Sequence, residues 1–263
     1  MQKTEVVLAT EQMVVAGETL KVLRGGNGPK VLVLHDEWGI DAHEEMWRLL
    51  GEQVEIIAPV APGFEDTDLS LNIKTVRDLA LLYSALLDHL SDDPISVIGV
   101  SFGAWVAIEM VVMNQHLFDR LILLGPLGLR FGTPDERNFA DLFALNESQL
   151  AERLYVNPDA ARVVTKESPR ELAVSWVRNR EASAIYGWEP YFHSPGLQRW
   201  TEYVTTPVAI VHGAEDRFVM PGYFEKYAAS FPNSSLIGIA RSGHFPHVDD
   251  PQLTFEALKP LLP

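Results

Sequence analysis

Short apolar runs alternate with amphipathic segments through the first half of the chain. Four runs consist mostly of aliphatic residues and end at turn-forming residues, which is the pattern of strands buried on both faces; they lie at 30–35, 54–60, 94–100 and 120–126. Three other segments have a helical pattern; they lie near 43–50, 74–90 and 102–116. Strands that alternate with helices in this way predict βαβ units, and therefore a mostly parallel central sheet flanked by helices.

The pattern changes at residue 131. Residues 131–203 contain no run typical of a buried strand and have the character of helices rich in large side chains, whereas strands are again expected at 206–213 and 234–240, each followed by a helix. The first 25 residues contain short strand-like runs separated by turns, which favours an antiparallel edge. We therefore expect an α/β core formed by residues 1–130 and 204–263, with a helical cap inserted at 131–203.

The composition narrows the class of protein. Of the 263 residues, 47% are apolar, which is enough to bury a sizeable core. The net charge of −15 disfavours nucleic acid as a partner. The chain has no cysteine, which excludes disulfides, thiolate metal sites and a cysteine nucleophile. No signal-peptide pattern and no run of ~20 apolar residues is present, so we expect a soluble cytoplasmic protein with no membrane partner. The oligomeric state stays open.

One serine lies between two glycines where a strand is expected to become a helix. Gly99, Ser101 and Gly103 form a G-x-S-x-G motif between the strand at 94–100 and the helix at 102–116. In such a turn the central residue adopts a strained backbone conformation and its side chain projects outward, while a Cβ at either glycine would collide with neighbouring backbone. The hydroxyl then lies at a helix N-terminus, where a developing negative charge is favoured.

A serine hydroxyl becomes a good nucleophile only with an oriented base nearby. The turn around Ser101 predicts that an acid and then a histidine follow along the chain. Glu215 and Asp216 come directly after the strand at 206–213, and His244 comes after the next strand. Because the carboxyl ends of parallel strands meet at one edge of a sheet, we expect these residues to converge on Ser101.

These motifs resemble the α/β-hydrolase family over nearly the whole chain. The matching segments are LVLHDEWG, APGF, VIGVSFGAW, VHGAEDRFV and SGHFPHVDDP, with the helical insertion where the family carries its cap. The resemblance implies that Ser101 is the nucleophile, Asp216 the acid and His244 the base. The family pattern H-G-x-x-D selects Asp216 over Glu215. His247 lacks the preceding glycine, so a structural or solvent-facing role is expected for it.

The same resemblance implies an oxyanion hole made of two backbone N–H groups, from Phe102 and Glu37. The family usually has glycine where this chain has Asp36. Two orientations of Asp36 are open: its carboxylate points into the site, where it opposes the developing charge, or it is held by local backbone hydrogen bonds. Glu65 also departs from the family, because it replaces the second glycine of a P-G-x-G turn.

Aromatic residues are concentrated in the insertion. Six of them occur within 25 residues: Trp176, Tyr186, Trp188, Tyr191, Phe192 and Trp200. Most are expected to pack the insertion together, but the underside of a cap also lines the substrate pocket. We expect Trp38, Trp176, Trp188 and His193 to face the pocket, which indicates a small, partly apolar substrate.

The other histidines show no metal-ligand spacing. His212 is expected in the core, and His43, His89 and His116 on the surface. We expect neither a metal nor a cofactor, since this chemistry needs none.

The sequence therefore predicts a serine hydrolase that cleaves a carboxylic ester or lactone through an acyl-enzyme at Ser101. Cleavage of a carbon–carbon bond in a ketone by the same triad is an alternative. A slow or non-catalytic small-molecule receptor and a cofactor-free oxygenase on this scaffold are two more. Epoxide hydrolases and haloalkane dehalogenases of similar fold need a carboxylate at the nucleophile position, so Ser101 argues against both.

Overall fold

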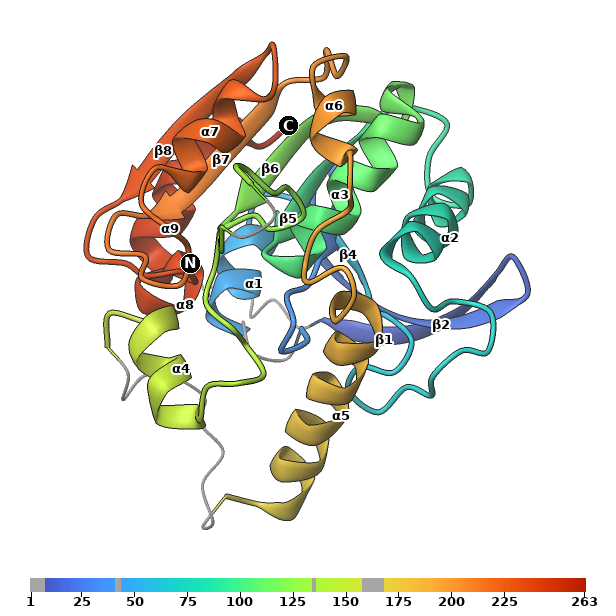
Figure 1. The fold of residues 1–263 in the computed structure, drawn as a ribbon. Coiled ribbons are helices and arrows are strands. Elements are labelled where there is room, and N and C mark those ends of the chain that lie inside the picture. Colours follow the sequence, from blue (N-terminus) through green and yellow to red (C-terminus); the bar gives the residue numbers. More distant parts are fainter. Residues whose placement is uncertain (1–7, 41–43, 134–135, 158–167) are drawn as a thin grey trace, which may run out of the picture.

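The computed structural model describes residues 8–40, 44–133, 136–157 and 168–263. These residues form an eight-stranded sheet (Figure 1). Its strands are β1 (Ala9–Val15), β2 (Glu18–Gly26), β3 (Lys30–Leu34), β4 (Glu55–Pro59), β5 (Ile95–Val100), β6 (Phe118–Leu124), β7 (Val208–Gly213) and β8 (Ser234–Ile239). The order across the sheet is β1-β2-β4-β3-β5-β6-β7-β8.

The first two strands pair antiparallel, and β2 pairs antiparallel with β4. Every other neighbouring pair is parallel. The prediction of a mostly parallel sheet with an antiparallel edge is thus confirmed. In this edge Ala9–Val15 form one strand, and residues 1–7 fall outside the described residues.

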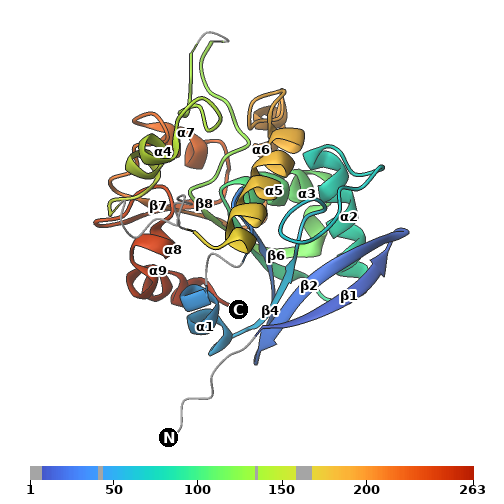
Figure 2. The same ribbon diagram turned by 90° about the horizontal axis from the view of Figure 1, so that it is seen from below.

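Helices cover both faces of the sheet, as Figure 2 shows. On one face lie α2 (Val76–Asp88), α3 (Phe102–Met113) and α7 (Tyr223–Ala229), and on the other lie α1 (Glu44–Gly51) and α9 (Pro251–Leu258). The short helix α8 (Pro246–Asp249) precedes α9. No helix among the described residues is long and apolar enough to cross a membrane.

Between β6 and β7 the chain forms three helices in the described residues. They are α4 (Glu147–Leu154), α5 (Arg170–Gly187) and α6 (Leu197–Thr201). In Figure 1, α4 and α5 lie below the sheet, and α6 lies beside α3. Helix α4 begins only at Glu147, because Asn146 and Gln149 form a reciprocal capping box there. The boundaries of a separate cap domain stay a prediction.

The central strand and helix position the site. All six residues of β5 are buried, because β3 and β6 flank the strand and helices cover its faces. Helix α3 is apolar almost all round and is buried from Phe102 through Val111. A helix of this kind is held by packing on every side. The turn from β5 into α3 is therefore rigidly placed.

Candidate active site

The turn between β5 and α3 holds Ser101 in a strained conformation. Its φ is +46° and its ψ is −103°, which non-glycine residues rarely adopt. A Cβ on Gly99 would lie 2.7 Å from the Cα of Ala104, and a Cβ on Gly103 would lie 2.2 Å from the carbonyl oxygen of Leu34. Both flanking positions therefore require glycine, and the hydroxyl is presented at the carboxyl end of the sheet.

Ser101, His244 and Asp216 form a continuous hydrogen-bonded line. The Ser101 Oγ lies 3.1 Å from Nε2 of His244, and Nδ1 of His244 lies 2.8 Å from Oδ2 of Asp216. The other oxygen of Asp216 accepts hydrogen bonds from the backbone N–H groups of Phe218 and Val219, at 2.7 and 3.1 Å. Asp216 is therefore fixed from both sides.

The electrostatics of His244 suit a base. The imidazole is fully buried. Burial lowers its pKa, but the carboxylates of Asp216, Glu37 and Asp36 raise it, and the pKa of His244 lies above its ordinary value. Glu215, the neighbour of Asp216, is exposed. The structure thus places Asp216, and not Glu215, against the imidazole.

The loop that carries His244 is also bonded to the insertion. The backbone N–H of His244 donates to the carbonyl oxygen of Leu154 on α4, at 2.8 Å. The Asp249 carboxylate accepts from the N–H of Gly243 at 2.7 Å and from the N–H of Val156 at 3.1 Å. The loop that carries His244 is therefore held partly by the insertion. Asp249 lies in the segment SGHFPHVDDP that resembles the family, but its carboxylate was not predicted to hold the loop.

The loop after β3 turns tightly around Asp36. Its Oδ1 accepts a hydrogen bond from the N–H of Trp38 at 2.7 Å, and its carbonyl oxygen accepts from the N–H of Gly39 at 3.3 Å. The other carboxylate oxygen lies 3.9 Å from Nε2 of His247. Asp36 is therefore held by local backbone bonds, which is the second of its two expected orientations. His247 is buried and does not face solvent.

The side chain of Glu37 has an environment that the sequence did not predict. It is completely buried, and neither carboxyl oxygen has a hydrogen-bond partner among the described residues. Burial and the neighbouring Asp36 raise its pKa to about 7, against a lowering by His244 and Ser101. The carboxyl of Glu37 therefore lies near Ser101 and His244. Only the backbone N–H of Glu37 was predicted to take part in the site.

Helix α5 holds the same loop through a row of small polar side chains. Ser183 Oγ donates to the carbonyl oxygen of Glu37 at 2.9 Å, and Asn179 Nδ2 donates to that of Trp38 at 2.5 Å. Ser175, one turn earlier, bonds to Glu65 and completes a row with a spacing of four residues. The recurrence of a small polar residue at every fourth position is a signal in the sequence, but it is weak beside the large side chains of the same segment.

Glu65 joins the loop to the helix. Its Oε1 accepts from the N–H of Ile40 at 3.0 Å, and its Oε2 accepts from the hydroxyl of Ser175 at 3.0 Å. Its own N–H donates to Oδ1 of Asn179 at 2.6 Å. Glu65 has a φ of +54°, the conformation for which the family uses glycine. Its three bonds offset the strain, so this departure from the family pattern has a structural purpose.

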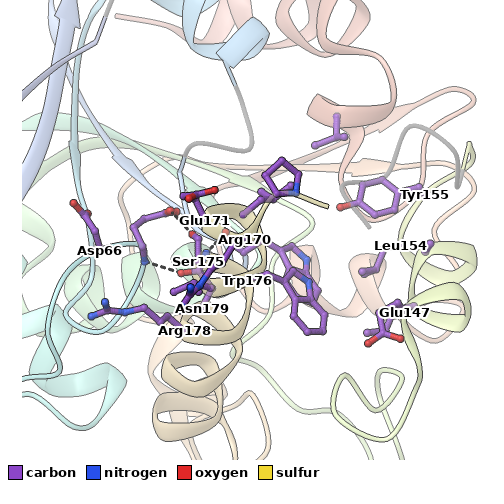
Figure 3. A pocket seen from close by; sticks show the side chains of 18 of the residues that line it. Asp66, Glu147, Leu154, Tyr155, Arg170, Glu171, Ser175, Trp176, Arg178 and Asn179 are labelled. Atoms are coloured by element: carbon purple, nitrogen blue, oxygen red, sulfur yellow. Dashed lines mark hydrogen bonds between the residues drawn. The ribbon is translucent and has the colours of Figure 1, made fainter. Parts of the chain in front are cut away.

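A cavity of about 730 Å³ lies between α4 and α5 (Figure 3). Trp38 and Trp176 both line it and stack on each other, with ring centres 6.3 Å apart and planes within 7°. In Figure 3, Trp176 projects from α5 toward the side where Leu154 lies. Ser101 and His244 are fully buried and do not line the cavity. It adjoins the site through Leu154, to which His244 is bonded, and through Trp38, two residues beyond Asp36.

The structure places Trp188 and His193 elsewhere. Both line a second hollow of about 430 Å³, which neither Trp38 nor Trp176 borders. Trp188 is 59% exposed, and Nδ1 of His193 bonds to the carbonyl oxygen of Tyr191 at 2.9 Å. Of the four residues expected to face one pocket, Trp38 and Trp176 line the larger cavity, whereas the other two line the second hollow.

Of the four histidines expected in the core or on the surface, three lie in the described residues. His89 and His116 are exposed, and His212 is half-buried with its ring stacked on Phe224. His43 lies outside the described residues. Within the described ranges, no group of three or more His, Asp or Glu side chains is arranged to hold a metal ion.

Comparisons with known proteins agree with this fold. A sequence model described as the Alpha/beta hydrolase family matches residues 31–257. The chain is 24% identical over 275 residues to the AB hydrolase superfamily protein YfhM of Bacillus subtilis, covering 92% of this chain and 95% of that protein.

Two solved structures extend the comparison. The 2-hydroxy-6-oxo-6-phenylhexa-2,4-dienoate hydrolase of Rhodococcus sp. strain RHA1 is similar with a TM-score of 0.73 and 17% identity, covering 97% of each chain. The epoxide hydrolase CorEH is similar with a TM-score of 0.72 and 21% identity, covering 97% of this chain and 100% of that one.

Proposed function

Because the chain belongs to the alpha/beta hydrolase family, we propose that it is a serine hydrolase that cleaves a carboxylic ester or lactone. The observation that carries the proposal is the hydrogen-bonded line from Ser101 through His244 to Asp216, with distances of 3.1 and 2.8 Å. A weak nucleophile, a base and an orienting acid are thereby aligned as acyl transfer requires.

In the proposed reaction, Ser101 Oγ attacks the ester carbonyl carbon while Nε2 of His244 takes the hydroxyl proton. The carbonyl oxygen becomes an oxyanion, which the N–H groups of Phe102 and Glu37 stabilise. The first of these lies at the start of α3, where helix N–H groups have no acceptor within the helix. The proton then passes from His244 to the leaving alkoxide, and an acyl-enzyme remains.

Water completes the cycle. His244 takes a proton from a water molecule as that water attacks the acyl carbon, and then returns it to Ser101 Oγ as the carboxylic acid leaves. Asp216 holds the ring so that Nδ1 carries its hydrogen toward the carboxylate, which leaves Nε2 free to accept.

We place the acyl or alcohol part of the substrate in the cavity between α4 and α5. Its walls include Trp38, Trp176, Leu150 and Leu154, which suits a partly apolar small molecule. Trp188 and His193 are not part of this proposed pocket, because they line the other hollow.

A second candidate is cleavage of a carbon–carbon bond next to a ketone by the same three residues. Its support is the similarity in fold to the 2-hydroxy-6-oxo-6-phenylhexa-2,4-dienoate hydrolase over 97% of both chains. Epoxide hydrolysis is not proposed, since Ser101 stands where that reaction needs a carboxylate.

The test is a panel of p-nitrophenyl esters of increasing acyl length, together with a fluorophosphonate that labels activated serines. We expect turnover and one covalent adduct, on the peptide containing Ser101. Folded protein that neither hydrolyses an ester nor forms the adduct would overturn the proposal in favour of a receptor. An adduct without ester turnover would favour the carbon–carbon bond reaction.

A further inference from the structure

The carboxyl group of Glu37 has no structural bond to explain its position. It is fully buried, both oxygens lack a partner among the described residues, and only its backbone carbonyl is bonded to α5. Leaving a buried carboxyl without a hydrogen bond costs about 1–3 kcal/mol or more. A group that is kept at such a cost in a reaction site is a candidate for the reaction itself.

Several charged or titratable groups face Glu37 from different elements. Asp36 lies on its own loop, His244 comes from the loop after β8, and the Ser101 hydroxyl comes from the turn before α3. In the insertion, burial raises the pKa of Tyr191, and Glu37 contributes to the rise. Burial and Asp36 favour the protonated form of the Glu37 carboxyl, whereas His244 and Ser101 favour the ionised form, and the balance raises its pKa to about 7.

The charge on Glu37 matters for catalysis. An ionised carboxylate beside Ser101 would repel the oxyanion that forms there, and it would stabilise His244 as the cation that cannot accept the serine proton. A protonated carboxyl has neither effect, and it also supplies an O–H donor in a site without water-exposed surface.

We propose that Glu37 is a catalytic residue whose protonated carboxyl donates a third hydrogen bond to the substrate carbonyl oxygen as it becomes the oxyanion. This inference rests on the proposed function. In the attack step the bond from Ser101 Oγ to carbon forms, the carbonyl π bond breaks, and the hydroxyl proton moves to His244. Glu37 keeps its own proton throughout. The active enzyme is then the form with Glu37 protonated and His244 neutral.

The pH dependence follows from the two groups together. The active form is lost at low pH when His244 becomes protonated, and it is lost again at high pH when Glu37 ionises. The pKa of Glu37 is raised to about 7 and that of His244 lies above its ordinary value, so the two ionisations overlap and belong to the pair. We expect a narrow bell-shaped profile of kcat/KM near neutral pH.

Three variants test the role. In Glu37→Gln an amide N–H can still donate but cannot ionise, so we expect the fall in kcat/KM above neutral pH to disappear, with activity near pH 6 kept within about 10-fold of wild type. In Glu37→Leu the donor is lost, so we expect kcat to fall by roughly 10²-fold at and below neutral pH, as for removal of one oxyanion donor, and by less above neutral pH, where wild type also loses the donor. The exposed Glu215→Gln is the matched control and should keep the wild-type profile.

The readouts are kcat and KM from pH 5 to 9 on a p-nitrophenyl ester that wild type cleaves, with circular dichroism to verify folding. The ionisation of Glu37 is followed independently by carboxyl carbon NMR, as the resonance that disappears in Glu37→Gln. A wild-type profile without a decline above neutral pH, or a Glu37→Leu variant as active as wild type, would overturn the role. If wild type forms the fluorophosphonate adduct and turns over ester in these cases, only the role of Glu37 fails; if it does neither, both proposals fall.

Discussion

The hydroxyl of Ser183 on α5 donates a 2.9 Å hydrogen bond to the carbonyl oxygen of Glu37, in the loop that faces the nucleophile. Ser183 is 1% exposed, so water does not compete for this bond. The insertion therefore contacts the proposed active site directly, through the backbone of Glu37, the residue expected to supply an oxyanion donor.

Ser183→Ala should loosen that loop. The carbonyl oxygen of Glu37 would be left buried without its donor, which costs about 1–3 kcal/mol of unfolding free energy. We expect kcat to fall by about 10-fold because the oxyanion donors lose their alignment. Denaturant unfolding and steady-state kinetics measure the two effects. Ser84→Ala is the control, since the Ser84 hydroxyl bonds only within α2; equal effects of the two substitutions would contradict the expectation.

Ser101→Ala should remove nearly all hydrolysis, by about 10⁴-fold or more, and leave the fold intact. The substitution should leave the positive φ at this position unchanged, because β5 and α3 fix the backbone there. Kinetics on an ester that wild type cleaves, together with loss of the fluorophosphonate adduct, provide the measurement. Substantial residual activity of the purified variant would show that another group attacks.

Asp216→Asn should reduce kcat by roughly 10⁴-fold, because an amide can bond to Nδ1 of His244 in the wrong tautomer. Glu215→Gln changes an exposed neighbour by the same chemistry and should have little effect. Both variants are compared by kcat/KM at one pH. The opposite ranking would transfer the role of the acid to Glu215.

Acid should inactivate the protein through His244. Only the neutral imidazole accepts the serine proton, and the pKa of His244 is raised by Asp216 and its other anionic neighbours against the effect of burial. Activity should therefore be lost as pH falls through a value above the ordinary ~6.5. In Asp216→Asn one of these anionic neighbours is missing, so the midpoint should move down. Residual kcat/KM against pH gives both midpoints, and an upward movement would exclude Asp216 as the partner.

Trp176→Ala should weaken binding of long acyl chains. Trp176 lines the cavity between α4 and α5 and stacks on Trp38, so its removal takes apolar surface from the proposed pocket. We expect KM to rise about 10-fold for a long acyl ester and little for acetate, in line with the loss of ~1–2 kcal/mol of apolar contact. Trp188→Ala is the control, because Trp188 lines the other hollow. A uniform effect of Trp176→Ala on both esters would place the acyl chain elsewhere.

Much of the sheet and the approach of Ser101, Asp216 and His244 could be predicted from sequence. Buried parallel strands have a strong local pattern, and residues that follow such strands must meet at one edge of the sheet. The glycines on either side of Ser101 predicted the tight turn there, because the close approach of Leu34 and Ala104 leaves no room for a Cβ.

The orientation of the Glu37 side chain and the role of α5 could not be predicted in this way. Both depend on how the insertion packs against the loop after β3, and no periodicity in the sequence encodes that contact. Ser175, Asn179 and Ser183 recur at every fourth position of a helix that also carries large exposed side chains, such as Val177. The packing of the insertion also decides that Trp38 and Trp176 line one cavity and Trp188 another.

The order of strands has a consequence for how the protein would lose activity on heating. β5 lies in the interior of the sheet, whereas β8 is an edge strand with mostly exposed or half-buried residues. Local openings begin at such margins and reach the centre last. Ser101, at the end of β5, therefore belongs to the more protected part of the sheet, and we expect the edge that carries the loop of His244 to open first. Opening of the β8 edge would separate His244 from Ser101 and abolish activity. Most of the sheet would stay folded, and its amide protons would remain protected from exchange with solvent.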